Sequence, residues 1–281
     1  MNFKKKHFGR QEGLEPIPAT TGSNSFPVLK RTVTRMRKQQ RYKTHNSSLF
    51  SSHRLDTDLK MALLILLVML TACAAMPQDL SGKMFIFPQE TDTANVRLST
   101  SMQSFTAVTA CFRSITDFSR NHNLFSLSTP SFHNGFLVFK EAGNNVIDIY
   151  VRNNRVTFTG QDYMLNTWQS ICTTWDSESE LVQLWLNGKP SIKKFIGGSV
   201  ITDPIVIVGQ EQDSHGGGFD INQSFVGMMS DVHMWNYVLS PCEIQRFVED
   251  LNFTPGNMIN WRALEFEATG RVLVENKITC E

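Results

Sequence analysis

Short apolar runs separated by turn-forming residues are the feature that most constrains the fold of this 281-residue chain. The runs are Met84–Phe87, Phe105–Phe112, Phe136–Phe139, Val146–Val151, Leu181–Leu186 and Ile205–Val208. The turn signals between them are Asn134-Gly135, Gly143-Asn144, Asn153-Asn154 and Asn187-Gly188. Many short strands with close polar turns favour an all-β jelly roll or two-sheet sandwich over a parallel α/β sheet.

Two local patterns predict further elements of this domain. Residues 181–195 form a hairpin candidate, because Asn187-Gly188 suits a two-residue turn. One helix is expected at 241–250. Ser240 caps its start, a Pro follows at the first helical position, and Glu243 completes a capping box. Leu239 and Ile244 have the spacing of a hydrophobic staple across that start.

The charge distribution divides the chain near residue 60. Residues 1–60 hold thirteen Lys/Arg against four Asp/Glu, whereas the remainder holds fourteen against twenty-two. We interpret 1–60 as a disordered or untranslated extension, with a nucleic-acid-binding or targeting arm at 31–43 as the alternative. The apolar stretch at 61–75 has the layout of a secretory signal peptide. Residues 76–281 then form one secreted domain, for which no nucleic-acid partner is expected.

The cysteines are interpreted for an oxidising compartment. Cys73 would leave with the signal peptide, so four cysteines remain in the secreted domain. They are Cys111, Cys172, Cys242 and Cys280. Four cysteines allow three pairings, which this count alone does not distinguish.

An oxygen-rich loop follows the last apolar run, at residues 209–224. Glu211 and Asp213 point to the same side of an extended segment. The glycines at 216–218 allow a tight turn that returns Asp220 and Gln223 toward this pair. Carboxylate and amide oxygens suit calcium, so the loop predicts a calcium site; a solvated acidic loop is the simpler alternative.

An enzymatic interpretation is weighed against that site. Glu211 and Asp213 resemble the start of the E-x-D-x-x-E sequence of jelly-roll glycoside hydrolases, which need two spaced carboxyl groups. The second Glu of that pattern is replaced here by Gly216. Nucleophile-elbow, zinc-protease and phosphate-loop motifs are also absent from the sequence. We therefore expect a protein that is not an enzyme.

The run at 208–244 closely resembles the pentraxin family, as do MFIFPQETDT (84–93), SICTTWDS (170–177) and NMINWRALEFEATG (257–270). The resemblance covers residues 78–275. It implies a flattened two-sheet jelly roll with one long helix, assembled as a cyclic homopentamer. It also implies two calcium ions on one face, where phosphate-bearing or carbohydrate ligands dock, and complement and Fc receptors as partners.

The resemblance assigns the calcium ligands by position. Glu211 and Asp213 would bridge both ions, with Gln212 contributing its backbone carbonyl. Asp220 and Gln223 would complete the second ion. The first ion needs an adjacent Asp-Asn pair, which here is His133-Asn134. Asn134 keeps an oxygen donor, whereas His133 is a doubtful ligand for calcium, so the first ion is expected to bind more weakly.

The resemblance also bears on ligand choice. In choline-binding members of the family a Phe contacts the choline methyl groups and a Glu faces the quaternary nitrogen. Phe139 matches that Phe, while Arg155 falls near the Glu position and would repel a cation. Tyr150 matches a Tyr in members that take phosphoethanolamine and acidic carbohydrate. Phe139 and Tyr150 are therefore the predicted ligand-contacting residues, with ordinary strand aromatics as the alternative.

The resemblance pairs Cys111 with Cys172, and a second bridge between Cys242 and Cys280 is a hypothesis. Asn222 and Asn252 begin glycosylation sequons, and the first adjoins the predicted ligand Gln223. The predicted function is calcium-dependent pattern recognition in acute-phase or innate immunity, aimed at phosphorylated head groups or microbial polysaccharide. A glycoside hydrolase and a pentraxin with a vestigial calcium site are the alternatives.

Overall fold

The computed structural model describes residues 59–64, 76–143 and 145–277. The chain separates into two units, residues 1–59 and 60–281, and the account below concerns the second. The predicted extension up to residue 58 and the signal-peptide residues 65–75 lie outside the described part. Residues 59–64 are helical. Among the described residues, no helix combines the length and apolar character needed to cross a bilayer.

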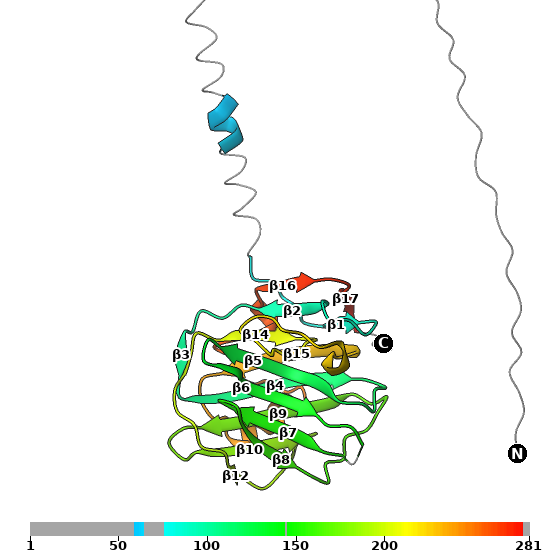
Figure 1. Cartoon of the computed structure of the whole chain (residues 1–281), viewed down its shortest axis with the longest axis vertical. Helices are drawn as coiled ribbons and strands as arrows, with labels where there is room; N and C mark the ends of the chain where they lie inside the picture. The colour runs from blue at the N-terminus through cyan, green and yellow to red at the C-terminus, as the bar shows by residue number, and fades with distance from the viewer. Residues whose placement is uncertain (1–58, 65–75, 144, 278–281) are drawn as a thin grey trace, which may run out of the picture. The chain divides into compact units, whose positions relative to one another are not determined.

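Two antiparallel sheets account for most of the domain, which confirms the predicted all-β fold (Figure 1). An eight-stranded sheet has the order β11-β10-β9-β4-β15-β1-β17, with β12 also paired to β10. Its strands are β11 (Lys189–Pro190), β10 (Leu181–Leu186), β9 (Gln169–Asp176), β4 (Ala107–Ile115), β15 (Gly227–Trp235), β1 (Lys83–Phe87), β17 (Leu273–Asn276) and β12 (Lys194–Phe195).

The second sheet has seven strands in the order β16-β2-β14-β5-β6-β7-β8. They are β16 (Phe266–Thr269), β2 (Asn95–Leu98), β14 (Ile205–Val208), β5 (His122–Thr129), β6 (Phe132–Lys140), β7 (Ile147–Val151) and β8 (Asn154–Phe158). A separate pair joins β3 (Ser104–Phe105) to β13 (Ile201–Thr202). Two 3-10 turns, η1 (Ile221–Gln223) and η2 (Trp261–Ala263), complete the connections.

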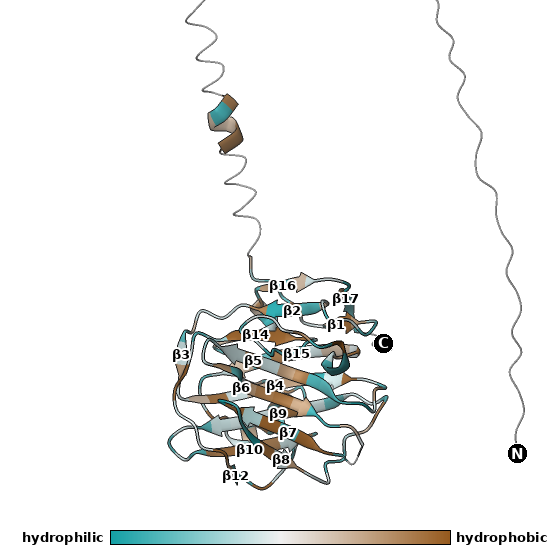
Figure 2. Ribbon diagram, in the orientation of Figure 1, coloured by the Kyte–Doolittle hydropathy of each residue, from teal (hydrophilic) through white to brown (hydrophobic). Residues whose placement is uncertain are grey.

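The core lies between the two sheets and takes residues from both. Phe112 of β4 stacks on Phe125 of β5 with ring centroids 6.0 Å apart, and Phe85 of β1 meets Trp261 edge-on at 4.9 Å. In the hydropathy colouring of Figure 2, strands such as β10 and β14 are largely brown and the connecting loops largely teal. Side chains alternate along a strand, so the outward residues of these strands are free for other roles.

The predicted hairpin and helix are both present. Asn187 and Gly188 have φ of +50° and +77°, and Leu186 pairs with Lys189 across them. Helix α2 (Pro241–Val248) begins with the full capping box of Ser240 and Glu243. It ends two residues before the predicted position 250, because Asp250 adopts φ of +55°, which ends the helix.

Helix α2 covers the outer face of the eight-stranded sheet. Ile244 and Phe247 belong to a buried cluster with Leu239, Trp235 and the two sulfurs of the disulfide. Leu239 and Ile244 thus share one cluster, as the staple pattern predicted. His233 of β15 lies beneath this helix, and burial lowers its pKa to about 4, so it is neutral at physiological pH.

One predicted turn was wrong. Asn134 and Gly135 lie within β6, and the chain reverses before them, between Thr129 and Phe132. Gly135 is needed there for close packing: a Cβ at this position would lie 3.0 Å from the carbonyl oxygen of Leu127. Gly in a strand often marks such a close backbone approach. The other displaced turn is a one-residue shift, since Arg152 and Asn153 have positive φ and Asn154 begins β8.

Cys111 and Cys172 form a disulfide between neighbouring strands β4 and β9, as the resemblance predicted. Both cysteines are fully buried below helix α2. Cys242 is exposed and forms no disulfide with any described residue. Cys280 lies outside the described residues, so the second bridge stays a hypothesis.

We predict that replacing both Cys111 and Cys172 by Ala lowers the free energy of unfolding by about 4 kcal/mol, because the bond closes a loop of 61 residues in the unfolded chain. Urea denaturation would measure the change. Ser101→Ala is the control, since that side chain is exposed, and it should leave the midpoint within error of the wild type. Equal losses in both variants would contradict the prediction.

Candidate functional site

The loop at residues 209–224 lies on the outer face of the seven-stranded sheet and is anchored there by Gln212. On β5, Phe125 and Leu127 enter the core, so Ser126 and Ser128 point to the opposite face. The Ser128 hydroxyl donates to Oε1 of Gln212 at 2.6 Å, and Nε2 of Gln212 donates to the Ile205 carbonyl at 3.1 Å. Both polar atoms of the Gln212 side chain are therefore used in hydrogen bonds within the protein.

A tight turn follows this anchor, as the glycine-rich sequence predicted. The amide of Ser214 donates to the carbonyl of Gly217 at 3.0 Å, and the reverse bond is 3.1 Å. Gly216 and Gly218 have φ of +82° and +75°. A Cβ at Gly218 would also lie 3.0 Å from the amide nitrogen of Ser214, so the turn requires glycine there on two grounds.

The three carboxylates of the loop affect one another electrostatically. Glu211 is 3% exposed. Its pKa is raised to about 7, first by burial and then by the negative charges of Asp213 and Asp220. Asp213 is exposed. Asp220 caps η1, where its Oδ1 accepts from the backbone and side-chain nitrogens of Asn222, both at 2.9 Å. The loop thus brings together the acids that its sequence suggested.

Three predicted site residues contribute to the thirteen buried side-chain atoms that have no hydrogen-bond partner among the described residues. Oδ1 of Asn134, Oε2 of Glu211 and Oε1 of Gln223 are buried and accept no hydrogen bond from any described residue. A buried acceptor without a donor costs about 1–3 kcal/mol, so native proteins rarely keep one without a purpose. These oxygens come from two separate segments of the chain, β6 and the loop at residues 209–224 with its turn η1.

Asn134 is held by its backbone rather than its side chain. Its amide donates to Oδ1 of Asn153 at 2.9 Å, and the Asn153 amide donates back to its carbonyl at 2.9 Å. The neighbouring His133 is exposed and makes no hydrogen bond or ion pair with the described residues. Among all the residues that the structure describes, no three His, Cys, Asp or Glu side chains lie closely enough together to hold a metal ion by themselves.

The predicted ligand-contacting residues lie on neighbouring strands of the same sheet. Phe139 of β6 faces Asp148 of β7 across the strand pair, and Tyr150 of β7 faces Arg155 of β8. Burial raises the pKa of the Tyr150 hydroxyl, to which Arg155 donates a hydrogen bond. Nη1 of Arg155 also lies 3.4 Å from Oδ2 of Asp148, whose side chain is only 2% exposed. The charge of Arg155 is therefore partly balanced.

A second acid adjoins this group. Burial raises the pKa of Glu141, and a hydrogen bond with Asp148 raises it further. Asp148 also keeps a buried Oδ1 without a partner among the described residues. The family resemblance predicted that Arg155 repels cations. It did not predict that Asp148 and Glu141 lie beside Arg155. The strand register alone places Asp148 next to Phe139, and that register is set by the fold.

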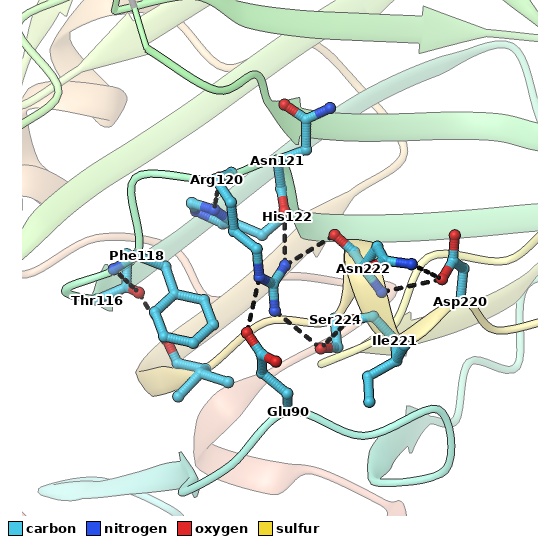
Figure 3. A network of polar contacts seen from close by, with 11 residues as sticks. Glu90, Thr116, Phe118, Arg120, Asn121, His122, Asp220, Ile221, Asn222 and Ser224 are labelled. Atoms are coloured by element: carbon cyan, nitrogen blue, oxygen red, sulfur yellow. Dashed lines mark hydrogen bonds and ion pairs between the residues drawn. The ribbon is translucent and has the colours of Figure 1, made fainter. Parts of the chain in front are cut away.

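Arg120 is the residue that the sequence did not indicate. It lies before β5 and reaches η1, 102 residues further along the chain, as Figure 3 shows. Its Nη1 donates to the Asn222 carbonyl at 2.9 Å, and its Nη2 donates to the Ser224 hydroxyl at 3.1 Å. Its Nε pairs with Glu90 at 3.1 Å. The two loop bonds bracket Gln223, so Arg120 fixes the turn that presents this residue.

Comparisons with known proteins agree with this fold. A family model described as "Pentaxin family" matches residues 83–276. Serum amyloid P-component of Sus scrofa is 38% identical over 221 residues, covering 76% of this chain and 98% of that protein. C-reactive protein of the same species is 37% identical over 222 residues, covering 78% and 98%.

A solved structure, the heptameric SAP-like pentraxin of Limulus polyphemus, matches with a TM-score of 0.65 at 22% identity. The match covers 70% of this chain and 96% of that one. At this identity the likeness concerns the fold, and it supports the jelly-roll sandwich described above.

We predict a pH-dependent stability that originates at Glu211. Its folded pKa of about 7 exceeds the ordinary value of 4.5. The folded state therefore binds the proton more tightly, and this stabilisation is full below pH 4.5 and lost as the pH rises through 7. The loss is on the order of 3 kcal/mol. Urea denaturation without divalent cations would measure the free energy of unfolding at pH 5 and pH 8. The decrease in this free energy from pH 5 to pH 8 should be smaller for Glu211→Gln than for the wild type.

Other groups titrate in the same window, so the comparison between variants is decisive rather than the profile itself. Glu178→Gln removes an exposed carboxylate and serves as the control; it should retain the wild-type difference. A Glu211→Gln profile that parallels the wild type would contradict the assigned cause.

We predict that Arg120→Lys loosens residues 209–224, because an ammonium group cannot reproduce the two guanidinium bonds to Asn222 and Ser224. Amide hydrogen exchange of this loop should accelerate about tenfold, corresponding to about 1.4 kcal/mol of lost protection. Glu90→Gln is the control, since it removes the ion pair and keeps both loop bonds. Unchanged exchange in Arg120→Lys would show that the bracket is not needed.

Proposed function

Because the chain belongs to the pentraxin family, we propose that it is a secreted, calcium-dependent pattern-recognition protein of innate immunity. Its ligands are phosphate-bearing head groups or carbohydrates. The observation that carries this proposal is the set of buried, unpartnered oxygens of Asn134, Glu211 and Gln223 on the outer face of the seven-stranded sheet. A hard cation satisfies such acceptors, and calcium takes six to eight oxygen ligands in irregular arrangements.

The chemistry of the donor set fits calcium. Glu211, Asp213 and Asp220 supply carboxylates, Asn134 and Gln223 supply amide oxygens, and Gln212 has only its carbonyl to offer because its side chain is used elsewhere. The three carboxylates repel one another, which explains why they do not lie close enough together to form a metal site in the absence of a cation. A bound divalent cation lowers the pKa of Glu211 by stabilising its charged form, so cation binding releases a proton near neutral pH.

Charge counting explains why an anion is the ligand. Two divalent ions held by three carboxylates leave an excess of about one positive charge. A phosphate oxygen or an acidic sugar compensates this charge and adds oxygen donors. His133 supplies no carboxylate to the first ion, so that ion depends more strongly on the ligand and on water.

The groups beside Phe139 favour phosphoethanolamine over phosphocholine. Asp148 and Glu141 supply oxygens that accept hydrogen bonds from a primary ammonium group, and Asp148 has one buried oxygen still unpartnered. Both ammonium groups meet the positive charge of Arg155, but a quaternary ammonium group cannot donate hydrogen bonds that offset this repulsion. Phe139 and Tyr150 supply the apolar surface for the methylene groups of the ligand.

The proposal includes secretion and a cyclic homo-oligomer. A buried disulfide is typical of proteins that fold in an oxidising compartment. The two edges of the eight-stranded sheet expose apolar side chains, Leu273 and Val274 on β17 and Ile192 and Phe195 beside β11 and β12. Two different patches on opposite edges suit a head-to-tail interface, which closes into a ring. The pentamer number is inherited from the family, and the Limulus relative is described as heptameric.

Calorimetric titration with calcium tests the proposal. We predict two binding events, of which one is weak because His133 occupies the position where the family resemblance implies a carboxylate. His133→Asp should tighten the weak event about tenfold or more, which corresponds to about 1.4 kcal/mol. Ser131→Asp is the matched control, because it adds the same charge two residues away on an exposed position. Equal tightening in both variants would indicate general attraction rather than coordination by residue 133.

The same preparations would then be applied to phosphoethanolamine and phosphocholine resins in calcium and eluted with a chelator. Retention on the first resin that a chelator abolishes supports the proposed function. Absence of both calcium heat and retention would leave only a pentraxin fold with a vestigial site.

A further inference from the structure

A groove of about 320 Å³ lies beside the loop at residues 209–224, which we call the calcium loop, at the end of β2 and the start of β14. Arg97, Ser99 and Gln103 line one wall, Asp203 and Pro204 line the other, and His215 borders it from the loop at 209–224. The two walls are joined where the Asp203 amide donates to the Gln103 carbonyl at 2.8 Å. The groove contains none of the residues assigned to calcium.

The strand order fixes how far this groove is from the proposed ion site. β14 and β6 are separated by β5, so Ile205 at the groove and Asn134 at the ion site are about two strand spacings, roughly 10 Å, apart. One hydroxyl connects both places. Ser128 Oγ donates to Gln212 at 2.6 Å and lies 3.2 Å from Nδ1 of His215. Ser128 therefore contacts both His215 at the border of the groove and Gln212 in the calcium loop.

The polar groups of the groove include both donors and acceptors that the protein does not use. Arg97 is exposed, and its guanidinium forms no hydrogen bond or ion pair with any residue in the described ranges. Asp203 is also exposed and offers carboxylate oxygens. The single hydroxyl hydrogen of Ser128 goes to Gln212, so Nδ1 of His215 is the donor in their contact.

This combination matches a sugar ring better than other ligands. A sugar hydroxyl can donate a hydrogen bond to the carboxylate of Asp203 and accept one from the guanidinium of Arg97. The half-buried Pro204 and Ile205 provide an apolar surface for the C–H face of the ring. The described lining holds no Phe, Tyr or Trp on which a nucleobase would stack. Arg97 adds a preference for a sugar that carries a carboxylate, sulfate or phosphate group.

We propose that this groove is a carbohydrate subsite, which binds the sugar unit next to the one whose anionic group is held at the calcium site. The inference rests on the proposed function and extends it from single head groups to oligosaccharides. It assigns Arg97 and Asp203 as residues that contact the ligand, and it predicts that affinity increases with oligosaccharide length within one subunit.

Calorimetry with mannose 6-phosphate and with a mannotriose phosphorylated at its terminal 6-position tests the subsite. Both are short enough to engage one subunit. In calcium the wild type should bind the trisaccharide about tenfold more tightly than the monosaccharide. Arg97→Gln and Asp203→Asn should each lose most of that gain and keep their affinity for the monosaccharide. Asn is chosen at 203 because the residue has φ of +49°, which Asn tolerates.

Arg246→Gln is the matched control, since it removes an exposed arginine from helix α2 on the other sheet. It should retain the full gain with length. A trisaccharide that binds no better than the monosaccharide, or an equal gain in wild type and both groove variants, would overturn the subsite alone. Failure of both ligands to bind in calcium would overturn the proposed function and the subsite with it.

Discussion

The burial of apolar side chains between two antiparallel sheets is the constraint on which the rest of the molecule depends. Because side chains alternate along each strand, every residue that enters the core leaves a neighbour on the outer face. On β5, Phe125 and Leu127 hold the sheets together, while Ser126 and Ser128 anchor the loop at residues 209–224 through Gln212. The register that packs the core therefore also positions the candidate site, and a one-residue slip would remove both.

Local sequence patterns predicted the elements that are determined locally. The capping box of α2, the turn at Asn187-Gly188 and the grouping of Glu211 with Asp213 and Asp220 all depend on residues a few positions apart. Asn134 and Phe139 were assigned by resemblance alone, since nothing near them in the chain marks a site. Arg120 had no signal, because its partners in the loop lie 102 and 104 residues away.

The buried oxygens without a partner among the described residues lower the stability of the folded state until a donor or cation satisfies them. Glu211 is buried beside two other acids, and Asn134 and Gln223 keep acceptors without donors. A folded state that contains such groups is less stable than the same core with those groups satisfied. Anything that binds the folded chain here therefore also stabilises it, by an amount that grows with ligand concentration. The bracket made by Arg120 keeps the loop ordered despite this cost.

The sandwich also separates two surfaces that evolution can change independently. Helix α2 packs on one sheet and the loop at residues 209–224 on the other, with about 10 Å of side-chain core between the sheets. Substitutions that far apart with no shared partner have nearly additive effects on free energy. Residues of the seven-stranded sheet such as His133 or Arg155 can therefore be exchanged during evolution without changing the contacts that hold helix α2 on the other sheet.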